Sequence, residues 1–273
     1  MKRLSVDACT EGTSKAVRAE IEAGADVNAE LESGWPPLVV ACARNRDVDV
    51  VRTLLSAGAA VAVRCSGGVT PLSAAAQDNP NPEVITTLAA AGAHVDQRLD
   101  NGWTPLMVAA ANSSNPAVIT ALANAGADVN ARTESGWTAL MSAASNNPHA
   151  GVVRALVEAG ASVDARNSKG WMALWFAAGK NPEPEVVTAL LDSGAGVNGR
   201  GGDGVTPLMS AAWNTRNPEI VRRLVRAGAD VHAKDDQGTT ALAYAERENP
   251  NPEIRAALIE SGAGARAWWK FWK

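Results

Sequence analysis

The sequence predicts an all-α solenoid of about eight helix-turn-helix units. A glycine recurs at a constant step of 34 residues, a leucine follows each glycine after four residues, and each period holds two short helical patterns. The glycines are Gly34, Gly68, Gly102, Gly136, Gly170, Gly204 and Gly238. The leucines are Leu38, Leu72, Leu106, Leu140, Leu174, Leu208 and Leu242, and Leu4 extends the series backwards. One helix pair cannot bury its apolar stripe alone, so the period predicts a stack of pairs.

The first helix of each unit is expected to start after a threonine. Five threonines precede a proline or an alanine at this place: Thr70, Thr104, Thr138, Thr206 and Thr240. A threonine side chain can accept a hydrogen bond from a free N–H group at a helix start, and proline is tolerated at the first helical position. Alanine-rich residues follow, so this helix is predicted to be short.

The second helix of each unit follows Asn-Pro or a close variant. In the third unit, Asn81 is expected to cap the helix and Pro82 to occupy its first position. Gly92 is expected to end it in a left-handed conformation. The apolar stripe between them consists of Val84, Ile85 and Leu88. This spacing gives the helix one buried face.

The predicted solenoid domain covers residues 1–264, followed by a tail at 265–273. The units are about 1–32, 33–66, 67–100, 101–134, 135–168, 169–202, 203–236 and 237–264. The first unit has Ala16 and Glu20 where the others carry Val or Ile and then Leu. The last has Arg255 in a column that is Val or Ile in the inner units. Polar replacements in different columns predict capping units at opposite ends.

These motifs resemble the ankyrin repeat: a turn glycine, Thr-Pro-Leu, two alanines, a second helix, and Gly-Ala-Asp-Val-Asn-Ala at residues 126–131. The resemblance covers roughly residues 1–264. The extra residue of the 34-residue period falls in the Asn-Pro loop, which is similar to prokaryotic members. The histidine that usually follows Thr-Pro-Leu is replaced, in four units by Met107, Met141, Trp175 and Met209. The resemblance implies a non-catalytic protein that binds a protein or peptide on its concave face.

A tryptophan follows the turn glycine in four units, at Trp35, Trp103, Trp137 and Trp171. The resemblance places this tryptophan row on the hairpin edge of the concave face. Four fully exposed rings would present about 600 to 1000 Å² of surface, which exceeds the usual largest apolar patch of a monomer. We therefore expect partial cover. The rings then either join neighbouring units, or also contact a partner, or act purely as a binding hot spot.

The predicted contact surface combines this row with positions on the first helices. Its members are Trp35, Trp103, Trp137, Trp171, Trp175, Trp213, Met107, Met141, Met209, Ala111, Ser145 and Gly179. In the middle units the rings would overhang small residues at Ala111, Ser145 and Gly179, with Trp175 and Trp213 near the far end of the slot. Neighbouring rings repeat at roughly 8 to 10 Å, wider than stacked rings, so a peptide side chain could enter between them.

Nothing in the sequence indicates catalysis, a metal, a cofactor or nucleic acid as a partner. The formal net charge is -4 and no basic stripe is present. His94, His149 and His232 stand at different places in different units, so they cannot form one cluster. The glycine-rich residues 199–204 lack the Lys-Ser/Thr pair of a phosphate loop and are interpreted as a connection between units.

The cysteines and the hydropathy indicate a cytoplasmic protein. Cys9, Cys42 and Cys65 are an odd number without metal-binding spacing, which fits a reducing compartment. Cys9 and Cys42 fall on first helices and are expected to be small buried residues. No apolar stretch is long enough to span a bilayer, so stable membrane insertion is not expected.

The tail breaks the repeat pattern and is rich in aromatic residues. Residues 265–273 contain Trp268, Trp269, Phe271 and Trp272 among basic residues. Three interpretations stay open: folding back over the last unit, contact with another copy of the chain, or contact with a membrane interface. The second gives an alternative function, a structural or self-assembling module whose tail mediates contacts between copies.

Overall fold

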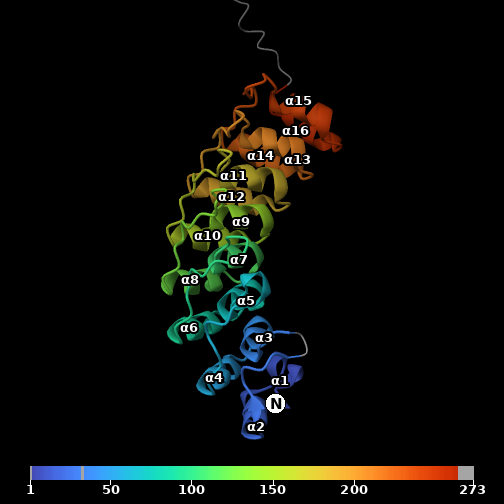
Figure 1. Ribbon diagram of the computed structural model, residues 1–273. Helices are drawn as coiled ribbons and strands as arrows, with labels where there is room; N and C mark the ends of the chain where they lie inside the picture. Colours follow the sequence, from blue (N-terminus) through green and yellow to red (C-terminus); the bar gives the residue numbers. More distant parts are fainter. Residues whose placement is uncertain (1, 32–33, 264–273) are drawn as a thin grey trace, which may run out of the picture. The chain divides into compact units, whose positions relative to one another are not determined.

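The computed structural model describes residues 2–31 and 34–263 (Figure 1). It divides the chain into two compact parts, residues 1–133 and 134–273, which we name the first half and the second half. The single continuous domain expected over residues 1–264 stays a prediction.

The described residues of the first half form four consecutive helix pairs. The helices are α1 (Val6–Thr10), α2 (Ser14–Glu22), α3 (Pro37–Arg44), α4 (Val48–Ser56), α5 (Pro71–Asp78), α6 (Pro82–Ala90), α7 (Pro105–Asn112) and α8 (Pro116–Asn124). A short 3-10 helix, η1, covers Ser66–Gly68. Two short parallel strands, β1 (Lys2–Arg3) and β2 (Ala25–Asp26), pair Lys2 with Ala25 and Arg3 with Asp26. This small sheet was not expected from the sequence, but the all-α fold class is confirmed.

The described residues of the second half form four further pairs. The helices are α9 (Ala139–Asn146), α10 (Ala150–Glu158), α11 (Ala173–Lys180), α12 (Pro184–Asp192), α13 (Pro207–Asn214), α14 (Pro218–Arg226), α15 (Ala241–Glu248) and α16 (Pro252–Glu260). First helices pack on first helices, in the order α9, α11, α13, α15. Second helices pack on second helices, in the order α10, α12, α14, α16. The first half repeats this arrangement, so each half has two helical layers (Figure 1).

The expected helix ends are confirmed. Each of the five threonines accepts a hydrogen bond from the backbone N–H group three residues later. The Asn81 side chain caps α6 through the N–H group of Glu83, and Gly92 adopts φ 92° after that helix. A side chain with a Cβ rarely adopts this conformation, so glycine is the residue suited to this turn.

The apolar columns of the second helices form the core. Two columns have no exposed surface: Val50, Val84, Val118, Val152, Val186, Ile220 and Ile254, and Leu54, Leu88, Leu122, Leu156, Leu190, Leu224 and Leu258. The polar replacements behave differently, because Ala16 and Arg255 are exposed and Glu20 is half-buried. The column residues are therefore buried within each half, as the sequence predicts.

Within each half, buried asparagines at the ends of first helices link several units to the one before them. The amide nitrogen of Asn79 donates to the carbonyl oxygens of Cys42 and Asn45 at 2.9 and 2.8 Å. Its oxygen accepts the N–H group of Asn81 at 2.9 Å. The same pattern recurs at other members of the column: Asn45, Asn181 and Asn249. We name this column the asparagine ladder.

A second asparagine, two residues after the ladder position, also links backwards, and it does so both beside a ladder asparagine and where the ladder has a hydroxyl residue. Ser113 and Thr215 replace asparagine, and each hydroxyl accepts the N–H group two residues later. In these loops Asn115 and Asn217 donate to the carbonyl oxygens of Pro80 and Pro182 at 2.7 and 3.1 Å. Side-chain amides therefore connect neighbouring units in both types of loop.

We predict that Asn181→Ala lowers the free energy of unfolding by about 2 to 4 kcal/mol, since it leaves two buried carbonyl groups and one N–H group without their partner. The matched control is Asn146→Ala at the exposed end of α9, with an expected change within about 0.5 kcal/mol. Urea unfolding of both variants measures the difference. Equal unfolding midpoints would contradict the role assigned to the ladder.

Candidate functional site

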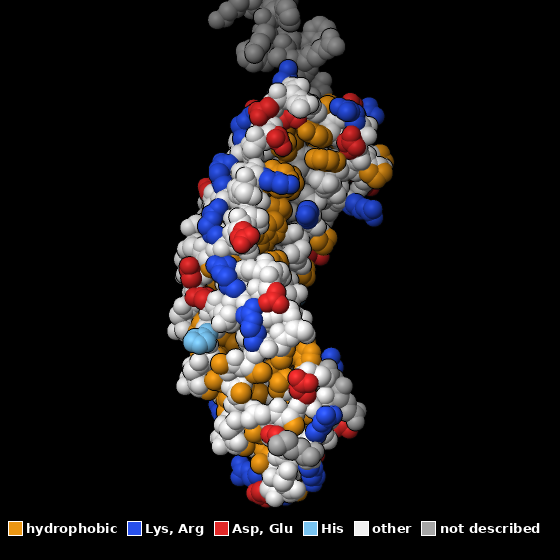
Figure 2. Space-filling model, viewed as in Figure 1, with side chains coloured by type: hydrophobic (Ala, Val, Ile, Leu, Met, Phe, Trp, Pro, Cys, Tyr) orange, Lys and Arg blue, Asp and Glu red, His pale blue; other side chains and the backbone are white. Residues whose placement is uncertain are grey.

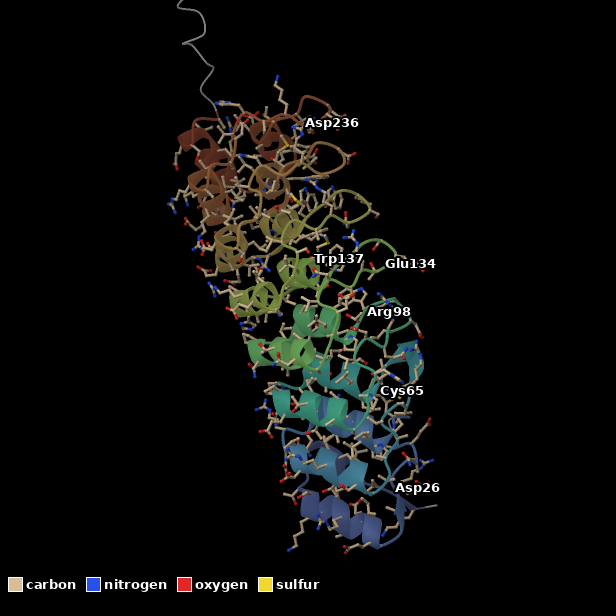
Figure 3. The ribbon with its side chains drawn as sticks, turned by 90° about the vertical axis from the view of Figure 1, so that its left-hand side faces the viewer. Asp26, Cys65, Arg98, Glu134, Trp137 and Asp236 are labelled. Atoms are coloured by element: carbon tan, nitrogen blue, oxygen red, sulfur yellow. The ribbon has the colours of Figure 1, made fainter. Side chains whose placement is uncertain are left out.

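A backbone hydrogen bond places Trp35, Trp103 and Trp171 at the base of their hairpins. The N–H group of Leu99 donates to the carbonyl oxygen of Trp103 at 2.9 Å, and that of Asn167 donates to Trp171 at 3.0 Å. Figure 3 shows Glu134 out on a hairpin loop and Trp137 closer to the helices. All four side chains of the row are half-buried. The expected partial cover is confirmed.

In the first half, Trp35 joins two units. Its ring packs against the apolar cluster of Val39 and Ala43 on α3 and Ala74 on α5. Hydrophobic side chains over this region are visible in the lower part of Figure 2. This contact matches the interpretation of the row as a contact between neighbouring units.

In the second half, a phenylalanine that sequence reasoning missed lies between two members of the row. The ring centroid of Phe176 is 4.4 Å from that of Trp137 and 6.0 Å from that of Trp171. Phe176 is 2% exposed. The expected opening between these two tryptophans is therefore filled by the chain itself, and this part of the slot prediction is wrong.

Trp137 is held in place by a hydrogen bond to its own unit. Its indole Nε1 donates to the hydroxyl of Ser142 on α9 at 2.8 Å. Phe176 stands 34 residues after Ser142, in the same column. The hydrogen bond from Trp137 to Ser142 in one unit thus corresponds to the ring contact of Trp171 with Phe176 in the next.

Trp171 and Trp175 form a parallel pair on the same unit. Their ring centroids are 4.2 Å apart with an interplanar angle of 8°. Trp175 is 6% exposed, and the stacked ring of Trp171 and the edge contact with Phe176 both contribute to its cover. Within the described part of the chain, the indole N–H groups of both residues are buried without a hydrogen-bond partner. Each such group costs about 1 to 3 kcal/mol, so this packing is not optimal for stability alone.

Trp213 and Tyr244 form a second stacked pair. Their ring centroids are 5.5 Å apart at 20°, and Trp213 is 43% exposed. The hydroxyl of Tyr244 donates to Oδ2 of Asp235 at 2.6 Å. The other oxygen, Oδ1, accepts the N–H groups of Gln237 and Thr239 at 2.9 and 2.8 Å. The tyrosine ring is therefore fixed to the hairpin before its helix.

These contacts shift two pKa values in opposite directions. Burial of the hydroxyl and its hydrogen bond to Asp235 raise the pKa of Tyr244 to about 12. Burial acts to raise the pKa of Asp235 as well, but the hydrogen bonds from Tyr244 and the two N–H groups outweigh it and lower this pKa. Asp235 is thus a carboxylate and Tyr244 a neutral phenol at neutral pH.

The two ring pairs line one cavity of about 740 Å³ in the second half. Trp171, Trp175, Trp213 and Tyr244 are its aromatic side chains, and Val205 is a further apolar one. Its polar side chains include Lys169, Asp203, Asp235 and Gln237. Figure 2 shows hydrophobic side chains exposed over α11, α13 and α15, interrupted by basic ones. The volume lies in the range of about 300 to 1,000 Å³ typical of ligand pockets.

Several predicted contact residues belong to the core instead. Met107, Met141 and Met209 are 0 to 1% exposed, because their first helices are covered on this side by neighbouring helices. A partner cannot reach these side chains, so their assignment to the contact surface is corrected. Ala111 and Ser145 are 9% exposed and offer little area.

Gly179 has a packing role. A Cβ atom there would collide with the hydroxyl and carbonyl oxygens of Ser210, so glycine allows α11 and α13 to approach each other. The small residue expected beneath Trp171 therefore serves a close contact between two helices.

The tail residues Trp268, Trp269, Phe271 and Trp272 lie outside the described residues.

The histidines and two of the three cysteines differ in their exposure. His94, His149 and His232 are exposed, and the described residues contain no group of three side chains that could hold a metal ion. Burial, followed by the charge of Glu20, raises the pKa of Cys9 to about 11, and burial raises that of Cys42. Both are fully buried, as predicted, and protonated thiols are weak nucleophiles.

Comparison with known proteins agrees with the repeat pattern. The family model described as Ankyrin repeats (3 copies) matches residues 6–98, 72–167, 152–235 and 174–267. A search of curated proteins finds no match. Among the described helices, none combines the length and the hydropathy that crossing a membrane requires.

We predict that Tyr244 titrates with a midpoint of about 12 in the folded protein and about 10 in urea. It is the single tyrosine of the chain, so tyrosinate absorbance reports it alone. Because the folded pKa is the higher one, its contribution to stability is present below pH of about 10 and lost as the pH rises towards 12. Asp235→Asn should move the native midpoint towards 10. A native midpoint equal to that in urea would show that the pair does not form.

Proposed function

We propose that this chain, which belongs to the ankyrin repeat family, binds a protein or peptide without catalysis. The contact would be made by the aromatic surface of its second half, which we define as the rings of Trp171, Trp175, Trp213 and Tyr244. Ankyrin repeat domains are typically protein-binding scaffolds. The observation that carries the proposal is the cavity of about 740 Å³ with four aromatic side chains in its lining. Trp171, Trp213 and Tyr244 of this lining are the residues we assign to contact.

Exposure distinguishes a binding role from a purely structural one. Trp213 is 43% exposed although its stacking partner covers one face. A ring that only joined neighbouring units would gain more by full burial. The unpaired indole N–H groups of Trp171 and Trp175 likewise favour a role beyond stability. Partly exposed tryptophans around a hollow are typical of binding hot spots.

The members of the tryptophan row differ between the halves in the contacts that explain them. Trp35 has contacts that suffice to explain it structurally. Trp103 is half-buried at an equivalent hairpin, and its role as a contact residue stays a prediction. We assign the partner to the second half because the ring pairs and the cavity lie there.

We infer a cytoplasmic location and no nucleic-acid partner. The three cysteines are free in the structure, with Cys9 and Cys42 buried, which suits a reducing compartment. The net charge of -4 does not favour binding to a polyanion.

The second candidate function is self-assembly through the tail. It is favoured by the four aromatic residues within positions 265–273. In that case the aromatic surface of one copy would bind the tail of another copy. Oligomers that disappear when residues 265–273 are deleted would support this candidate over a foreign partner.

The proposal is tested by selecting binders from a random peptide library displayed on phage and measuring their affinity for two variants. Trp213→Ala should weaken binding at least about tenfold, as expected for a hot-spot ring. The matched control is Ile259→Ala on α16, since Ile259 is the other large hydrophobic residue exposed in the described chain, at 46%. Its effect should stay within about twofold.

Melting temperatures of both variants check that the fold is retained. Absence of any saturable binder, or binders that tolerate Trp213→Ala as well as Ile259→Ala, would overturn the proposal.

A further inference from the structure

Trp213 has a ring face that its stacking partner leaves open. Tyr244 covers one face, and the side chain is still 43% exposed. Two other rings nearby carry a cation of this chain: Lys169 Nζ is 5.1 Å from the ring centroid of Trp171, and Lys180 Nζ is 5.8 Å from that of Phe176. Within the described residues, no such cation is found over Trp213. Its open face is therefore a place where a cation from outside can bind.

A carboxylate without an ion pair lines the same cavity. Asp203 is exposed, and no salt bridge to it is found among the described residues. Asp236 is paired with Arg200 at 3.1 Å, and Asp235 is held by Tyr244. Asp203 is close enough to Tyr244 for its charge to act on the tyrosine hydroxyl. An electron-rich ring and a free carboxylate thus lie in one lining.

We propose that this part of the cavity binds the guanidinium group of an arginine side chain from the partner, stacked on Trp213 and paired with Asp203. The inference rests on the proposed peptide-binding function and names the chemistry of its anchor residue. Arginine suits the site better than lysine, because its planar group can stack on an indole and donate two hydrogen bonds to one carboxylate.

The charges around the cavity leave Asp203 as the carboxylate that favours a cation there. Lys169 lies over Trp171 on the other ring pair, and Arg200 is engaged by Asp236. Arg247 is exposed and its charge also acts on Tyr244. Local basic and acidic groups therefore nearly balance, so the preference for a cation comes from the ring face and the Asp203 carboxylate rather than from net charge.

The test uses the full chain and the blocked peptide Ac-Gly-Arg-Gly-NH₂, with the citrulline peptide as its neutral isostere. The indole N–H signals of the nine tryptophans are followed in a proton–nitrogen correlation spectrum, and the Trp213 signal is assigned from Trp213→Phe. We expect a saturable shift of this signal with a millimolar dissociation constant. Citrulline and Asp203→Asn should each weaken binding at least about threefold. Asp192→Asn, which removes an exposed carboxylate on α12, should leave it unchanged.

Equal binding of the arginine and citrulline peptides, equal effects of Asp203→Asn and Asp192→Asn, or no saturable shift would each overturn the inference. If library-selected peptides still depended on Trp213 in that case, the proposed function would stand and only the identity of the anchor would be wrong.

Discussion

The structure depends on a buried side-chain amide that bridges consecutive units. In the asparagine ladder, one side chain donates to carbonyl groups 34 and 37 residues earlier and accepts an N–H group two residues later. Asn79 and Asn181 are 1 to 3% exposed, so the carbonyl groups that they reach have little water to replace a lost donor. An insertion or deletion between the linked residues would displace both contacts with the preceding unit together. These contacts therefore favour a constant period of 34 residues.

Because the period is constant, residues 34 positions apart occupy equivalent places in successive units. The aromatic surface forms where a large aromatic residue stands at a place that holds a small residue in neighbouring units. Phe176 occupies the row of Ser142 and Ser210, and Trp213 occupies the row of Ser145 and Gly179. The rings then meet across units, as Trp137 does with Phe176. The cost of this arrangement is visible in the two buried indole N–H groups without a partner. Such a local departure from good packing is expected where a surface serves recognition.

Features that repeat from unit to unit could be predicted from the sequence, whereas contacts that occur in one unit only could not. Helix caps such as Thr70 and the buried leucine column follow from local rules applied at a fixed step, and the structure confirms them. The asparagine ladder could have been found from the same step, since Asn45, Asn79, Asn147, Asn181 and Asn249 keep it. The burial of Met141 was missed because an alanine-rich helix has no clear polar face from which to orient it. The contacts of Phe176 and Tyr244 depend on side-chain conformations in neighbouring units, which periodicity does not specify.

The most direct test of this account is hydrogen exchange at the side-chain amides of Asn79, Asn181 and Asn249, measured by NMR on the full chain. If each amide bridges two units, its protons should exchange as slowly as the backbone amides of the adjacent first helices, because exchange then requires neighbouring units to separate. The amide of Asn146, exposed at the end of α9, provides the fast reference in the same spectrum. Exchange of the ladder amides at the rate of Asn146 would show that no amide bridge holds the units in register.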